Sequence, residues 1–107
     1  MSIERWQTAW RQLIAHGSPF EVVTPSDGAP RYFRHAAHDL LQVIDAGRVH
    51  GDREFLVWQS QRLTFNQYYD QVDRLAGQMV SRFGLQPGER VAIAMRNQPA
   101  WLVAFAA

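Results

Sequence analysis

The sequence predicts an α/β fold that contains one β–α–β unit, and three observations lead to this. Residues 66–83 repeat apolar side chains every three or four positions, which is the spacing of an amphipathic helix. Residues 90–95 form an apolar run without alternation, as expected of a parallel strand covered on both faces. A short strand at 62–65 precedes the helix, so the three segments predict a right-handed crossover between parallel strands.

Both ends of the long helix carry recognisable capping signals. Thr64 and Gln67 have the spacing of a capping box, in which the threonine hydroxyl and the glutamine side chain each bond a backbone N–H of the other residue. Gly84 stands where a left-handed cap ends a helix. Pro87-Gly88 then predicts a tight turn.

Upstream of this unit, the pattern predicts two helices and a hairpin. The helices cover 3–15, capped by Ser2 and ended by Gly17, and about 34–46, stopped by Gly47, with a loop over 17–31 between them. The hairpin joins strand 54–59 to strand 62–65 by a reversal at Ser60-Gln61.

Downstream of residue 95, a loop leads to a helix that starts at Pro99 and continues to Ala107. This helix is apolar and has no capping residue, and a parallel strand needs neighbours in a larger sheet. We therefore expect an incomplete N-terminal segment of a larger domain. In this organisation, residues 1–53 supply leader helices and a loop, and residues 54–107 supply the strand pair, a helix, the buried strand and the start of the last helix.

The composition excludes several kinds of chemistry. The net charge is +1, and all 11 basic residues are arginines that lie scattered along the chain, so we expect no nucleic-acid partner. Without lysine the chain cannot form a Schiff base or a P-loop, and without cysteine it has no thiol chemistry. The start of the chain has no signal-peptide pattern, and its longest apolar run, Ala100–Ala107, is too short to span a membrane. A cytoplasmic location is the expectation.

Four short sequence motifs, in this order, resemble the early part of the AMP-forming acyl-CoA ligases, a family of adenylate-forming enzymes. They are Arg62-Leu63-Thr64-Phe65, Val72-Asp73-Arg74-Leu75-Ala76, the run from Gly84 to Ile93, and Asn97-Gln98-Pro99-Ala100-Trp101. Three positions depart from the usual pattern, with Phe65 for tyrosine, Glu89 for aspartate and Ala100 for glutamate, but each keeps the physical role of its position. The resemblance covers about 62–107.

The resemblance implies an acyl-CoA synthetase as the parent enzyme, with ATP, Mg and CoA as its ligands. A carboxylic acid, which we expect to be a fatty acid, would become an acyl-adenylate and then pass to CoA. This chemistry needs a phosphate-binding loop, an acidic magnesium ligand and a lysine, which lie far downstream in the family. We therefore expect no catalytic, cofactor-binding or metal-binding residue here, and an inactive segment whose partner is the rest of the parent chain. Two alternatives remain: the start of a peptide-synthetase adenylation domain, and a small non-enzymatic interaction or dimerisation module.

A few residues invite functional hypotheses, each with a simpler structural interpretation. Arg96 and Asn97 follow the end of the buried strand, where α/β sheets bind ligands, although a plain loop with a solvated arginine fits as well. His35, His38, Asp39 and His50 could ligate a metal, but solvated histidines are the simpler expectation. The glycines at 84 and 88 predict turns rather than a phosphate loop, and the four tryptophans predict packing. The apolar last helix predicts self-association of the isolated chain.

Overall fold

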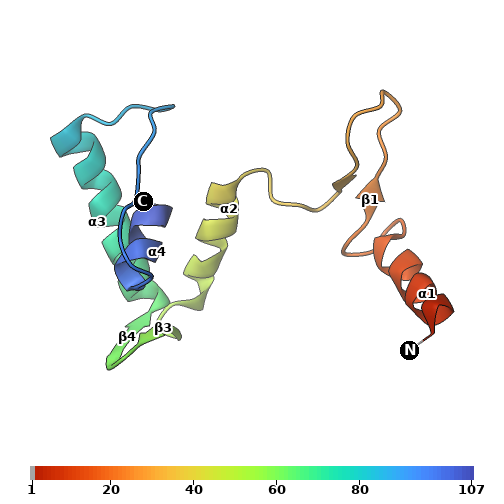
Figure 1. Cartoon of the computed structure of the whole chain (residues 1–107), viewed down its shortest axis with the longest axis horizontal. Helices are drawn as coiled ribbons and strands as arrows, with labels where there is room; N and C mark the ends of the chain where they lie inside the picture. Colours follow the sequence, from red (N-terminus) through yellow and green to blue (C-terminus); the bar gives the residue numbers. More distant parts are fainter. Residues whose placement is uncertain (1) are drawn as a thin grey trace. The chain divides into compact units, whose positions relative to one another are not determined.

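The computed structural model describes residues 2–107 and divides them into two compact units, one ending at His38 and one beginning at Asp39 (Figure 1). The described residues form helices and two separate two-stranded antiparallel sheets. This mixture is consistent with the α/β class. Over residues 2–107, no helix has both the length and the apolar character needed to cross a bilayer.

The first unit contains helix α1 (Ile3–Ile14) and the strand pair β1 (Val22–Val23) and β2 (Tyr32–Phe33). The predicted helix and its cap are confirmed, because the Ser2 hydroxyl accepts the Arg5 N–H at 3.4 Å. The predicted loop contains β1, which pairs antiparallel with β2. The strands are only two residues long, so local hydrogen bonds rather than an extended ladder hold this hairpin.

The second unit opens with helix α2 (Leu40–Asp45), followed by the 3₁₀ helix η1 (Ala46–His50). The predicted helix 34–46 is therefore wrong at its start, and Gly47 does not stop it, because η1 continues through Gly47 to His50. Asp39 sets the observed start, because its side chain accepts the Gln42 N–H at 2.7 Å and caps the first turn.

Strands β3 (Glu54–Trp58) and β4 (Gln61–Thr64) form the predicted hairpin, with the reversal one residue earlier than expected. Gln61 pairs with Trp58, so Gln59 and Ser60 make the turn. Gln59 has φ +53°, a left-handed conformation that costs a non-glycine residue energy. A bulge between Glu54 and Leu56 shifts the register of the strand pair.

Helix α3 (Phe65–Phe83) is the longest element, and its predicted capping box is confirmed. The Gln67 N–H donates to the Thr64 hydroxyl at 3.2 Å, and the Thr64 N–H donates to the Gln67 side chain at 3.0 Å. Gly84 ends the helix in the left-handed conformation, with φ +67°, as the sequence predicts.

Helix α4 (Pro99–Ala106) lies beside α3, and the core of the second unit forms between them (Figure 1). Its buried apolar members are Tyr68, Tyr69, Val72 and Val103. Partly buried apolar side chains from α2, α3, α4 and the hairpin surround this cluster: Ile44, Leu56, Phe65, Leu75, Leu102 and Ala106.

Residues 90–95 do not show the predicted parallel strand, and the β–α–β unit is accordingly not observed. The segment is irregular and mostly exposed. A strand exists only through hydrogen bonds to a neighbour, and among residues 2–107 the strands pair solely as β1 with β2 and β3 with β4. The apolar sequence of 90–95 thus predicts burial that the described residues do not provide.

The turn at Gln59 yields a stability prediction. Only the first central residue of this two-residue turn has positive φ, a pattern in which glycine is preferred. Gln59→Gly should therefore raise the free energy of unfolding by about 0.5–1 kcal/mol, measured by urea melts. Ser60→Gly is the matched control, because Ser60 has no positive φ. A gain for Ser60→Gly and none for Gln59→Gly would contradict this account of the turn.

Candidate functional site

The sequence candidates Arg96 and Asn97 lie in the loop that leads into α4. Pro99 at the first turn fixes the start of that helix, and the Tyr68 hydroxyl donates to the Leu102 carbonyl at 3.1 Å, which ties α4 to α3. Arg96 and Asn97 are both exposed, and their side chains make no hydrogen bond or ion pair with the described residues. Asn97 therefore does not close the loop by bonding its own backbone.

Two open hollows flank this loop. One is lined by Met95, Asn97 and Trp101, whose indole stacks on Phe105 with centroids 5.3 Å apart. The other lies between the β3–β4 hairpin, α3 and the start of α4. Its lining comprises Trp58, Gln61, Leu63, Gln71, Gln98, Pro99 and Ala100. Neither lining includes a side chain that titrates near neutral pH, so these hollows can pack or position a group but cannot transfer a proton.

Backbone N–H groups of the segment from Gly84 to Glu89 are already hydrogen-bonded, either to the end of α3 or within the segment. Gly84 N–H donates to the Val80 carbonyl at 3.0 Å and Leu85 N–H donates to the Met79 carbonyl at 3.1 Å, which closes the end of α3. Gln86 N–H donates to the Glu89 carboxylate at 2.7 Å. A phosphate loop needs several free N–H groups that point at one anion. This segment instead has the turn structure that the sequence predicts.

The histidines considered as metal ligands lie on different local structures. His35 and His38 precede α2 rather than lying on one face of it, and Asp39 is occupied as the helix cap. His50 packs on Phe65 with ring centroids 4.7 Å apart. Within residues 2–107, no group of three or more potential ligands is gathered in a geometry that could hold a metal ion.

Asp73 lies in the second of the four sequence motifs, Val72–Ala76. The structure gives it an ion-pairing role that sequence reasoning missed. Its two carboxylate oxygens accept hydrogen bonds from the Arg48 guanidinium at 3.0 and 2.7 Å, and Asp45 accepts a third at 2.9 Å. The same guanidinium lies over the Tyr69 ring, 4.3 Å from its centroid. Hydrogen bonding to Arg48 lowers the pKa of Asp73, and the two carboxylates raise the pKa of Arg48. This cluster holds η1 against α3.

Glu21 is the buried charged residue of the first unit, and no sequence pattern pointed to it. Its carboxylate accepts the Gly17 N–H at 2.9 Å, the Arg34 guanidinium at 2.6 Å and His16 Nδ1 at 3.0 Å. The Gly17 N–H makes the largest contribution, followed by Arg34 and His16, and together they lower the pKa of Glu21 to about 2. Glu21 thus joins the end of α1 to the hairpin by charge-assisted bonds.

Comparison with known families identifies the class of this protein. A family model described as AMP-binding enzyme matches residues 44–107, which is more than half of the chain and includes both the Arg48 cluster and the core between α3 and α4. The chain belongs to this family of adenylate-forming enzymes. No curated protein and no solved structure matches the chain significantly.

The Glu21 contacts generate a pH prediction. Because the folded-state pKa lies below the ordinary value of 4.5, the stabilisation is present above about pH 4.5 and is lost as the pH falls towards 2. The urea midpoint of the first unit, followed by amide NMR signals of residues 18–34, should therefore fall between about pH 6 and pH 3. Glu21→Gln should lower that midpoint at the higher pH and remove most of its pH dependence.

Asp27→Asn is the control for this experiment. Asp27 is an exposed carboxylate of the same unit that accepts only the Ala29 N–H, a bond that asparagine can keep. This variant should retain the wild-type midpoint and its pH dependence. Equal pH dependence in wild type and Glu21→Gln would refute the role assigned to Glu21.

Proposed function

We propose that this chain forms the N-terminal structural portion of an AMP-forming acyl-CoA synthetase. That enzyme would activate a carboxylic acid with ATP and transfer the acyl group to CoA. The observation that carries the proposal is the match of residues 44–107 to the AMP-binding enzyme family. The acyl-CoA ligase subtype is supported by the order of the four sequence motifs between Arg62 and Trp101.

The role proposed for these residues is architectural, because they do not fit a nucleotide. The chain has no lysine, and the turn from Gly84 to Glu89 uses its N–H groups internally, one of them on a carboxylate that would repel phosphate. The hollows beside Asn97 contain no proton-transfer group. ATP, Mg and CoA would therefore be held by other residues of the parent enzyme, and Arg96 and Asn97 would at most lie near a ligand.

An apolar carboxylic acid, such as a fatty acid, is the substrate class that we propose for the parent. The start of a peptide-synthetase adenylation domain is the alternative within the same family. Both would be cytoplasmic, with the rest of the parent chain as the partner of this segment. The acid that supports adenylation separates the two alternatives, because an adenylation domain activates amino acids.

A small interaction module is the candidate from a different class. Large apolar side chains exposed in both units favour it, among them Trp6 at 55% and Phe83 at 74% exposure. Such a module would have a protein partner or would associate with itself. It would show no adenylating activity in any context, which distinguishes it from the enzyme.

Pyrophosphate exchange tests the proposed function in two arms. The 107-residue chain with Mg-ATP and acetate or decanoate should give no exchange above the blank, because it lacks the phosphate loop and the lysine. The product of the gene's complete reading frame, assayed with the same acids and with a set of amino acids, should show exchange with decanoate. Exchange by the 107-residue chain would overturn the architectural role. No exchange by the complete product would favour the interaction module.

A further inference from the structure

The first unit contains an apolar groove that the proposed function does not use. It lies between α1 and the β1–β2 hairpin and consists of two adjacent hollows of about 240 and 210 Å³. Trp10, Ile14 and Phe33 line both hollows, so these three side chains form a shared wall. Each hollow alone is below the usual size of a small-molecule site, but a slender ligand could extend along both.

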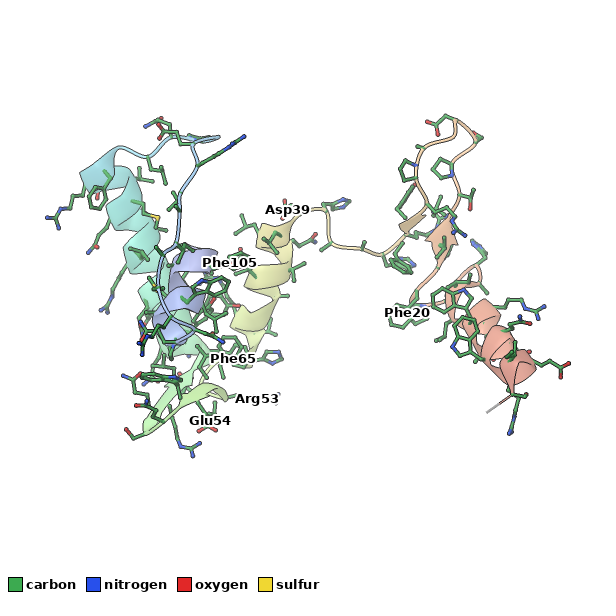
Figure 2. All side chains as sticks on the ribbon, in the orientation of Figure 1. Phe20, Asp39, Arg53, Glu54, Phe65 and Phe105 are labelled. Atoms are coloured by element: carbon green, nitrogen blue, oxygen red, sulfur yellow. The ribbon has the colours of Figure 1, made fainter. Side chains whose placement is uncertain are left out.

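The two ends of the groove differ in chemistry. At one end Arg31 and Tyr32 complete the lining together with Val22. At the other end Leu13 and Phe20 complete it, and the surface there is entirely apolar. Figure 2 shows Phe20 where the chain passes from α1 to the hairpin. The groove therefore has one cationic end and one hydrocarbon end.

Arg31 is the charged side chain of this groove, and its charge is not neutralised. It is exposed and makes no hydrogen bond or ion pair with any described residue. Arg34, three residues on, is bonded to Glu21 at 2.6 Å, and that carboxylate also accepts from His16 and Gly17. Arg31 is thus available for an anion from outside the chain.

The apolar side chains of the groove are unusually exposed for their size. Trp10 is 46% exposed, Phe20 57%, Tyr32 55% and Phe33 47%. Covering such side chains contributes about 25 cal/mol for each Å² removed from water. A ligand with a hydrocarbon body would gain this contribution, and an anionic head would add the contact with Arg31.

We propose that this groove binds a single-chain anionic amphiphile, with its head at Arg31 and its chain over Trp10 and Phe33 towards Leu13 and Phe20. The proposal is one of binding and not of catalysis, since neither a histidine nor a carboxylate lines the groove. The inference does not rest on the proposed function, because binding here involves neither ATP nor the residues matched to the family.

The charge distribution favours a free amphiphile over a bilayer surface. Docking on an anionic bilayer requires several available basic side chains around an apolar face. Here Arg34 is paired with Glu21, and neither Arg5 nor Arg11 lines the groove. One available guanidinium at one end of a concave groove matches one anionic head group.

Decanoate is the probe that tests this site. It would be titrated into the 107-residue chain below its micellar concentration, with Trp6, Trp58 and Trp101 replaced by phenylalanine so that emission reports on Trp10. We expect saturable binding with a blue shift. Decyltrimethylammonium, which has the same chain length and the opposite charge, should bind at least about tenfold more weakly.

Variants assign the binding to the groove. Arg31→Gln should weaken decanoate binding by about tenfold and leave the binding of neutral decanol unchanged, because only the head-group contact is lost. Arg11→Gln is the matched control and should bind decanoate like the parent chain. Amide NMR spectra establish that each variant keeps its fold.

Four results would overturn the proposal. Equal affinity for decanoate and decyltrimethylammonium, or an unchanged decanoate affinity in Arg31→Gln, would show that Arg31 holds no anion. A blue shift that appears only with phosphatidylglycerol vesicles would assign the groove to a bilayer. A blue shift that rises with protein concentration and without ligand would assign it to a second copy of the chain.

Discussion

Two consecutive tyrosines on α3 hold the second unit together. Neighbouring side chains on a helix point about 100° apart, so Tyr68 and Tyr69 reach different neighbours. The Tyr68 hydroxyl donates to the Leu102 carbonyl in α4, and the Tyr69 hydroxyl donates to the Ile44 carbonyl in α2. Both rings are about 95% buried and contact each other edge to face, with centroids 5.0 Å apart. Burial raises the pKa of Tyr68.

Other features of the second unit follow from the position of Tyr69. Gly47 fits beside it, because a Cβ at that position would clash with the tyrosine hydroxyl oxygen. The Arg48 guanidinium lies over the Tyr69 ring and is fixed there by Asp73. The segment matched to the AMP-binding family begins at residue 44, the residue whose carbonyl Tyr69 binds. The family segment and the tyrosine-linked unit are therefore nearly the same residues.

Local signals in the sequence predicted local structure well. The capping box at Thr64, the Gly84 cap, the hairpin and the helix beginning at Pro99 depend on residues within a few positions of each other, and the structure confirms them. The predicted start of α2, at about residue 34, was wrong because the Asp39 side chain caps the helix and sets its start at Leu40. The parallel strand at 90–95 was expected from burial, which depends on neighbours that a pattern cannot supply. The Glu21 and Arg48 clusters join residues 13 and 25 positions apart, and no periodicity identifies such pairs.

Native-state amide hydrogen exchange on Tyr68→Phe and Tyr69→Phe tests the tyrosine account most directly. Each variant keeps the buried ring and removes one hydroxyl together with its hydrogen bond to the carbonyl, at a cost of about 1–1.5 kcal/mol. The account predicts about tenfold lower protection in α4 for Tyr68→Phe and in α2 and η1 for Tyr69→Phe, with the other element unchanged in each case. Equal losses in both elements for either variant, or no loss in either, would contradict it.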